Sequence, residues 1–185
     1  LGDLGWNSNS GTDHDGDGCR DSSEDLDDDN DGVEDLDPDN CPQGEVGWIS
    51  DSLNDYDGDG CKDDVEDNDD DGDGVVDGND NCDDGDLNWT SSPATDHDGD
   101  GCQDSGEDPD DDGDSVLDDD DNCSKGDTGW TSTPSTDADG DGCKDSTEDL
   151  DDDNDTIADT SDNCPSISNL DQEDHASDLI GDVWD

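Results

Sequence analysis

The twelve residues 13–24 read D-H-D-G-D-G-C-R-D-S-S-E. Side chains that carry oxygen stand at positions 1, 3, 5, 9 and 12 of this stretch, and glycine stands at position 6. The spacing is typical of a calcium loop, in which alternate side chains turn inward and the chain bends at the glycine. We expect the backbone carbonyl of Cys19 to be the ligand at position 7, and Glu24 to reach across with both oxygens. The stretch therefore predicts a site for a hard divalent cation.

The pattern is repeated along the chain. It returns, with every acidic position and the glycine kept, at residues 55–66, 96–107 and 137–148. A tryptophan stands seven residues before each copy, at Trp6, Trp48, Trp89 and Trp130. We therefore expect four tandem repeats, at residues 5–46, 47–87, 88–128 and 129–168. Residues 1–4 match the end of a preceding repeat, and residues 169–185 match a degenerate terminal repeat.

Each repeat holds a second acidic loop, which begins three residues after the glutamate that ends the first. The pattern is complete at residues 69–80, whereas the loop of repeat 1 carries one extra residue before Asp39. Repeats 3 and 4 place Ser115 and Thr156 at position 6, where the other loops have glycine. We expect these two loops to bind a cation less well or to bend differently, because glycine tolerates the backbone conformation of a tight bend.

The candidate metal ligands are the residues at positions 1, 3, 5, 7, 9 and 12 of the eight loops, with the backbone carbonyl as the ligand at position 7. In the first loops they are Asp13, Asp15, Asp17, Cys19, Asp21, Glu24, Asp55, Asp57, Asp59, Cys61, Asp63, Glu66, Asp96, Asp98, Asp100, Cys102, Asp104, Glu107, Asp137, Asp139, Asp141, Cys143, Asp145 and Glu148. In the second loops they are Asp27, Asp29, Asp31, Val33, Asp35, Asp39, Asp69, Asp71, Asp73, Val75, Asp77, Asp80, Asp110, Asp112, Asp114, Val116, Asp118, Asp121, Asp151, Asp153, Asp155, Ile157, Asp159 and Asp162.

The charge of the chain suggests how many ions it takes. Sixty-six acidic and four basic residues give a formal net charge of −62. A charge run usually marks a solvated surface, but solubility does not require a fixed spacing with a glycine at the bend. One ion per loop would leave about −46, which is still strongly repulsive. We therefore expect about 8 to 16 calcium ions per chain, some of them shared between loops. The residues placed to bridge two loops are Asp25, Asp67, Asp108 and Asp149.

The composition leaves little material for a hydrocarbon core. Of 185 residues, 21% are hydrophobic and 3% aromatic, with no Phe and no Met. Burial of this small number of apolar side chains cannot offset the conformational entropy that the chain loses on folding. We therefore expect cations and disulfides to order the chain. Only Asp25 and Leu26 separate the first two loops, which leaves no room for flanking helices. We expect a mostly irregular, calcium-organised tandem repeat rod with little regular secondary structure, stapled by disulfides and without a conventional hydrophobic core.

The pattern D-x-D-x-D-G-x-x-D-x-x-D-N-C-P resembles the thrombospondin type 3 repeat, and prolines follow Cys41 and Cys164 as in that family. Residues 163–172, N-C-P-S-I-S-N-L-D-Q, match the family's link between motifs. The motif after it is decayed: Ala176 removes a ligand, Leu179 replaces the bend glycine, and Trp184 stands where the family has cysteine. The resemblance implies a chain wound round calcium ions, with disulfides between successive cysteines.

Eight cysteines in a chain so poor in hydrophobic residues indicate disulfides and an oxidising compartment. Pairing across repeats would leave Cys19 and Cys164 alone, and Trp184 at a ninth cysteine position also favours pairing within repeats. The prediction is Cys19–Cys41, Cys61–Cys82, Cys102–Cys123 and Cys143–Cys164. Each ring of about 20 residues would stabilise the fold by roughly 3 kcal/mol in the chain-entropy model.

These features predict an extracellular protein, secreted or at the cell surface, that serves as a calcium-rigidified stalk or filament subunit. Its partners would be further copies of itself, or neighbouring repeats of a longer chain. One alternative is an adhesion module that binds a protein or glycan through the Trp/Ser/Thr-rich segments. Another is an acidic calcium-buffering or mineral-binding protein, which needs neither cysteines nor a regular sequence repeat. Triplets for N-glycosylation occur at Asn88, Asn122 and Asn154.

Other functions find little support in the sequence. No Ser-His-Asp or Cys-His arrangement and no phosphate-binding glycine loop stands out, so we expect no enzyme. The negative charge excludes nucleic acid as a partner, and no apolar run approaches the ~20 residues that membrane insertion requires. We expect the tryptophans to form a miniature core in each repeat. His14 and His97, at position 2 of a loop, should face solvent, and without a His/Cys cluster a zinc site is not expected.

Overall fold

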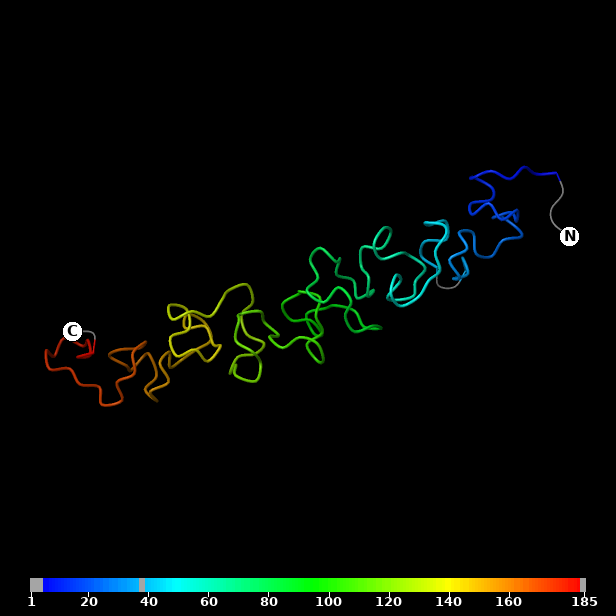
Figure 1. Ribbon diagram of the computed structural model, residues 1–185. Coiled ribbons are helices and arrows are strands. Elements are labelled where there is room, and N and C mark those ends of the chain that lie inside the picture. Colours follow the sequence, from blue (N-terminus) through cyan, green and yellow to red (C-terminus); the bar gives the residue numbers. More distant parts are fainter. Residues whose placement is uncertain (1–4, 37–38, 184–185) are drawn as a thin grey trace. The chain divides into compact units, whose positions relative to one another are not determined.

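A computed structural model of the chain describes residues 5–36 and 39–183. Within these residues there is no helix, and Glu34 alone has the conformation of an isolated strand bridge. The chain consists of turns, bends and irregular segments (Figure 1). The prediction of a mostly irregular fold is therefore confirmed. The chain forms two compact units, Leu1–Ser91 with Asp100–Cys102, and Ser92–Gly99 with Gln103–Asp185. The repeat boundaries stay a prediction from the sequence.

The buried residues of the described chain are carboxylates and cysteines instead of hydrocarbon side chains. The buried hydrophobic residues are Cys61, Cys102, Cys143 and Cys164. The buried polar residues are Asp13, Asp28, Asp29, Asp31, Asp55, Asp71, Asp73, Asp96, Asp111, Asp112, Asp114, Asp137, Asp155 and Asn169. Large apolar side chains such as Leu53 and Leu150 are exposed. As predicted, the described residues form no conventional hydrophobic core, and something other than hydrocarbon must hold the buried carboxylates together.

The acidic loops share one pattern of closure. The backbone N–H of Asp21, at position 9, donates to the carbonyl of Thr12, the residue before position 1. The same bond joins Asp35 to Leu26, Asp63 to Asn54, Asp77 to Asn68, Asp104 to Thr95, Asp118 to Pro109, Asp145 to Thr136, Asp159 to Leu150 and Asp182 to Glu173. In all nine cases the N–H at position 2 also donates to Oδ1 at position 9. Equal spacing in the sequence has therefore produced equal local structure.

The bend at position 6 has the same backbone conformation whether or not glycine is present. Gly74 has a φ of 100°, and Ser115 and Thr156 have φ values of 83° and 82°. The N–H of Thr156 donates to Asp151 Oδ2 (2.9 Å), the bond that Gly74 makes to Asp69 (3.1 Å). The expectation that the serine and threonine loops bend differently is therefore wrong. Instead they hold a left-handed conformation that is strained for a residue with a side chain, and most of all for β-branched threonine.

Replacing Thr156 by glycine is expected to stabilise the protein by about 1 kcal/mol, because it removes the strain of a β-branched residue at positive φ. Thermal unfolding followed by circular dichroism measures the change. The matched control is Gly74→Thr, which introduces the same strain into repeat 2 and should lower the melting temperature. A lower melting temperature for Thr156→Gly would contradict the argument.

Disulfides join consecutive repeats. The bonds are Cys41–Cys61, Cys82–Cys102 and Cys123–Cys143, and Cys19 and Cys164 are free. The predicted pairing within repeats, Cys19–Cys41, Cys61–Cys82, Cys102–Cys123 and Cys143–Cys164, is therefore wrong. Each bond ties the end of one repeat's second loop to position 7 of the next repeat's first loop. Three disulfides indicate an oxidising environment.

Hydrogen bonds of the asparagine before each bonded cysteine explain this pairing. Asn40 donates its backbone N–H to the carbonyl of Asp59 (2.7 Å) and its side-chain amide to Asp59 Oδ2 (2.6 Å). These contacts align the segments that lead into Cys41 and Cys61, whose Cα atoms are 5.1 Å apart. Asn81 and Asn122 make the same pair of bonds to Asp100 and Asp141. Bonding within repeat 1 would instead require Cys19 to reach Cys41 across the whole second loop.

The two free thiols are expected to differ from each other in reactivity. Cys164 is fully buried, so it should react with iodoacetamide only after unfolding. Cys19 is half-buried, and the Asp17 carboxylate, burial and nearby acids raise its pKa to about 11, so its alkylation at pH 7 should be slow. Peptide mapping by mass spectrometry without reduction should find both thiols labelled after unfolding. Labelling of Cys41 or Cys61 under those conditions would contradict the disulfide pairing.

Candidate metal centres

Carboxylates converge at the predicted loop centres. In the first loop of repeat 1, ligand oxygens of Asp13, Asp15 and Asp17 all lie within 4.8 Å of one another. In the second loop the same is true of Asp27, Asp29 and Asp31 (the latter two buried). The described residues hold twelve further groups of this kind, drawn from His, Cys, Asp and Glu, and one of them is the cluster of Asp21, Asp25 and Asp28. In these two loops the carboxylates of positions 1, 3 and 5 lie together, close enough to hold a metal ion.

Individual carboxylate oxygens in these centres are buried without a hydrogen-bond donor. Asp31 and Asp114, both at position 5 of a second loop, are 0% exposed, and Oδ2 of each has no hydrogen-bond partner. Oδ1 of each accepts the backbone N–H two residues on, that of Val33 (2.8 Å) or Val116 (2.7 Å). Burying an ionised carboxylate is costly unless it is paired. The donor set, with orphaned anionic oxygens in hard-ligand clusters, therefore fits a hard cation.

The residues at position 12 face their own loop and a neighbouring repeat. Burial, and after it the negative charges of Asp29 and Asp31 in the same loop, raise the pKa of Asp39 to about 6. A Cβ atom at Gly60, in the next repeat, would lie 2.5 Å from Asp39 Oδ1. In first loops the long side chain points to the preceding repeat: Glu148 accepts the backbone N–H of Asp127 (2.6 Å). Position 12 therefore lies at the contact between repeats, which the spacing alone does not reveal.

Position 9 is used differently from positions 1, 3 and 5. Oδ1 of every position-9 aspartate accepts the N–H of position 2, as described above, so this oxygen closes the loop. Oδ2 of Asp21 instead accepts from the Gln43 amide (3.4 Å), and Oδ2 of Asp104 accepts from Lys125. In Asp21 and Asp104 the second oxygen is therefore directed to a group outside the loop, whereas Oδ2 of Asp182 contacts His175 at position 2 of its own loop.

Burial and mutual repulsion raise the pKa of many of these carboxyl groups in the metal-free protein. Burial, and then the neighbouring charges of Asp29 and Asp27, raise the pKa of Asp31 to about 6. Burial is also the largest cause for Asp70, where Asp77, Asp63 and other acids add to it and the pKa rises to about 7. The same combination raises the pKa to about 6 at Asp39, Asp57, Asp71, Asp121 and Asp139, and to about 7 at Asp152.

These shifts predict that acid compacts the metal-free protein. The folded form holds protons on groups such as Asp31 and Asp70 at a pH where the unfolded chain, with a pKa near 3.8, has lost them. The stability from these groups is therefore complete below about pH 4 and is lost as the pH rises through about 6 to 7. In EDTA, the hydrodynamic radius from dynamic light scattering should increase between pH 4 and pH 8. A radius that decreases over this range would contradict the sign.

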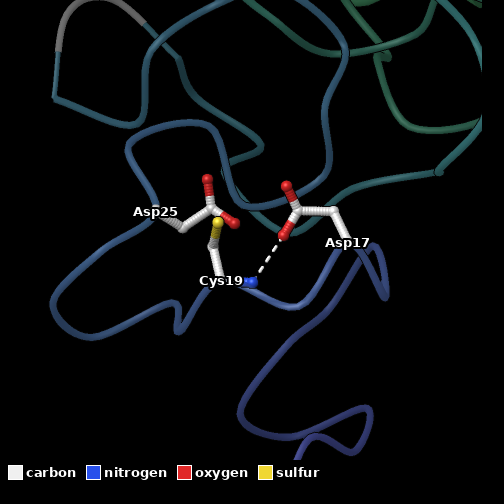
Figure 2. A group of neighbouring side chains, drawn as sticks. All are labelled: Asp17, Cys19 and Asp25. Atoms are coloured by element: carbon white, nitrogen blue, oxygen red, sulfur yellow. Dashed lines mark hydrogen bonds between the residues drawn. The ribbon is translucent and has the colours of Figure 1, made fainter. Parts of the chain in front are cut away.

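The first loop of repeat 1 differs from the others because Cys19 is a free thiol. Figure 2 shows its sulfur beside the Asp25 carboxylate, while Asp17 accepts the Cys19 backbone N–H (2.6 Å). Ligand atoms of Asp17, Cys19 and Asp25 lie within 4.8 Å of one another. Hydrogen bonding to Asp17 and burial disfavour the thiolate, as the raised pKa of Cys19 indicates. The cysteines at this position in repeats 2 to 4 are all in disulfides.

Residues at position 2 of the first loops have a role that sequence reasoning missed. His14 and His97 each place Nε2 2.9 Å from a carbonyl oxygen, that of Gly44 or Gly126, and Tyr56 donates its hydroxyl to Gly85 (3.0 Å). All three side chains are half-buried. The expectation that His14 and His97 face solvent is therefore wrong, because these rings reach the turn that follows the second cysteine of the same repeat, Cys41 or Cys123.

The four tryptophans that precede the first loops, Trp6, Trp48, Trp89 and Trp130, are half-buried, and two of them contact a lysine. Lys62 Nζ lies 5.9 Å from the ring centroid of Trp48, and Lys144 Nζ lies 5.6 Å from that of Trp130. The segment that contains Trp48 also contacts the preceding second loop, because Ser50 donates its backbone N–H to the Asp31 carbonyl (2.8 Å). A packing role for the tryptophans fits these contacts.

The three candidate glycosylation residues differ in availability. Asn88 is exposed. The side-chain amide of Asn122 is occupied by Asp141 Oδ2 (2.7 Å), and that of Asn154 hydrogen-bonds with Asp139. The described residues contain no helix that is long and apolar enough to cross a membrane. Comparison with family models and with curated proteins found no match to this chain.

Proposed function

We propose that this protein is an extracellular calcium-binding repeat protein with a structural role, a stalk or filament subunit stiffened by its ions. The observation that carries the proposal is the burial of carboxylate oxygens that no donor in the described chain satisfies, as at Asp31 and Asp114. The chain has only four basic residues for 66 acidic ones. Cations from solution are therefore the counter-charge available to most of these groups.

Calcium fits these centres better than other common metals. It takes six to eight oxygen ligands in flexible geometry, whereas magnesium demands a near-octahedral site and keeps several waters. The loops offer carboxylates from positions 1, 3 and 5, such as Asp13, Asp15 and Asp17, and the calcium-loop pattern adds the backbone carbonyl of position 7. Extracellular calcium modules operate at 10⁻⁴ to 10⁻³ M, and the disulfides suit the same compartment. We infer about 8 to 16 ions per chain.

The structural role follows from the links between repeats. Disulfides such as Cys41–Cys61 tie neighbouring repeats covalently, and Asn40 and Asp39 contact the next repeat beside that bond. In such arrays each unit contacts mainly its neighbours, so stiffness depends on the interfaces. Calcium at these interfaces would set the stiffness of a stalk, or of a filament made with further copies or neighbouring repeats. We propose no catalytic role.

The alternative of an adhesion module is less favoured, because Trp48, Trp89 and Trp130 are half-buried instead of forming an exposed platform. A simple calcium buffer would need neither the disulfides nor the repeated hydrogen bonds of the loops. A glycan at exposed Asn88 is compatible with the structural role.

Calcium removal is the direct test of the proposal. Native mass spectrometry in excess calcium should find about 8 to 16 ions per chain, and EDTA at pH 7.5 should expand the oxidised protein in small-angle scattering. The variant Asp31→Asn should lose one ion, whereas the control Asp119→Asn, at an exposed position between ligands, should lose none. Fewer than about four ions, or an equally compact protein in EDTA, would refute the proposal.

A further inference from the structure

The first loop of repeat 1 has an uncovered face that the first loops of the other repeats bury. It consists of Asp17, Gly18 and Cys19, at positions 5 to 7, and we call it the open face. Asp17 and Gly18 are exposed, and Cys19 is half-buried. The equivalent glycines and cysteines of repeats 2 to 4 are all buried, and they are Gly60, Gly101, Gly142, Cys61, Cys102 and Cys143. The same surface is therefore covered in three repeats and uncovered in one.

In repeats 2 to 4 an Asp-Asn-Cys segment from the end of the preceding repeat covers this surface. Asn40 donates to the carbonyl and to Oδ2 of Asp59, and the cysteine that follows Asn40 forms the disulfide. Asp39 lies over Gly60, since a Cβ atom on that glycine would be 2.5 Å from Asp39 Oδ1. The same three contacts are made by residues 80–82 and 121–123. One kind of segment thus recognises this surface three times in the molecule.

The open face already has the conformation of its covered equivalents. The N–H of Cys19 donates to Asp17 Oδ1 (2.6 Å), the bond that the other three first loops make at these positions. Gly18 has a φ of 96°, close to the 88° of Gly60. Among the described residues, no asparagine donates to Asp17, and a Cβ atom on Gly18 would meet nothing within 4 Å. The surface that binds an Asp-Asn-Cys segment is therefore preformed, and it carries a free thiol where the disulfide forms.

The fourth copy of the segment in this chain, residues 162–164, is itself covered. Cys164 is 0% exposed, and the carbonyl of Asn163 accepts the backbone N–H of Gly181 (3.0 Å). The side-chain amide of Asn163 donates to the Gln172 carbonyl (3.2 Å). A Cβ atom on Gly181 would overlap Cys164 Sγ. A second molecule therefore cannot offer this copy to the open face without displacing its own residues 172–181.

We propose that the open face is a docking site for an Asp-Asn-Cys segment of another acidic repeat that carries a free cysteine. The incoming asparagine donates to the carbonyl and carboxylate of Asp17, the incoming aspartate lies over Gly18, and the incoming cysteine bonds to Cys19. The inference rests on the structural role proposed above, and it names the partner that extends the array at repeat 1.

The covalent bond forms by thiol–disulfide exchange. The incoming cysteine is held in a mixed disulfide with a small thiol such as glutathione, and the Cys19 thiolate attacks its sulfur. The bond between the two proteins' sulfurs forms as the mixed disulfide breaks. Glutathione leaves as the thiol and takes the proton that Cys19 has given up, so the step needs no further oxidant.

The test is the coupling of a synthetic peptide to the whole, oxidised chain in excess calcium, followed by mass spectrometry. The peptide has the sequence of residues 39–46, D-N-C-P-Q-G-E-V, with its cysteine as the glutathione mixed disulfide. The control peptide N-D-C-P-Q-G-E-V exchanges the first two residues and keeps the composition. We expect the first peptide to couple to Cys19 about tenfold faster, because the control loses two hydrogen bonds to Asp17.

Two glycine variants of the protein test the contact from the other side. Gly18→Ala places a methyl group where the incoming aspartate lies, and should slow the coupling about tenfold. Gly16→Ala is the matched control, because Gly16 also has a positive φ (78°) and open space at its Cβ position. Its equivalents stay open in the covered repeats, at Gly58, Gly99 and Gly140. Gly16→Ala therefore carries a similar backbone strain and should couple at the rate of the unaltered protein.

Equal coupling of the two peptides, or equal rates for Gly18→Ala and Gly16→Ala, would overturn the inference, as would faster coupling at Cys164 than at Cys19. Dimers of the protein alone, linked from Cys19 to Cys164, would show that a second copy is the occupant and would overturn the choice of partner. Ions are counted separately. Selective coupling with fewer than about four bound ions would refute calcium binding and leave the docking site in place. A full set of ions without selective coupling would do the reverse.

Discussion

The repulsion between buried carboxylates is the constraint on which the rest of this structure depends. Asp29 and Asp31 are almost fully buried, and their oxygens share one cluster with those of Asp27. Like charges at this separation in a medium of reduced dielectric repel by several kcal/mol per pair. Protons relieve the repulsion in acid, and a bound cation would relieve it at neutral pH. A bound cation thus acts where a soluble domain has its hydrocarbon core, since it makes burial of the surrounding groups favourable.

The loops use aspartate more than glutamate because the two carboxylate oxygens of each aspartate have different roles. Asp31 uses Oδ1 to accept the N–H of Val33, and Oδ2 remains directed to the cluster. A side chain one methylene longer does not make this short-range bond to the backbone two residues on. The aspartates therefore shape the loop and supply its charge at once. A loop built in this way keeps its bend even at Thr156, because the N–H of that residue still finds Asp151.

The local structure of the loops could be predicted from sequence, because each bond within them joins residues only a few positions apart. The disulfide pairing could not. The cysteines follow one another at nearly equal spacing along this periodic chain. Cys41 could therefore pair with either Cys19 before it or Cys61 after it as far as the sequence shows. The hydrogen bond from the Asn40 side chain to Asp59 of the next repeat favours the Cys41–Cys61 pairing. The burial of Asp28 was missed for a similar reason, since alternation describes one loop and says nothing of the loop packed against it.

Asp59 shows how a metal centre and a repeat contact can be one structure. It stands at position 5 of a first loop, its Oδ1 accepts the N–H of Cys61, and its Oδ2 accepts the side-chain amide of Asn40 from the preceding repeat. Each carboxylate oxygen has a second lone pair, so both remain able to bind a metal. An ion that orders Asp59 therefore also orders the partner of Asn40 and the approach to the Cys41–Cys61 bond. Order gained in one loop would therefore pass to the adjacent repeat through this residue, so the proposed ion binding would be coupled between neighbouring repeats wherever that arrangement recurs.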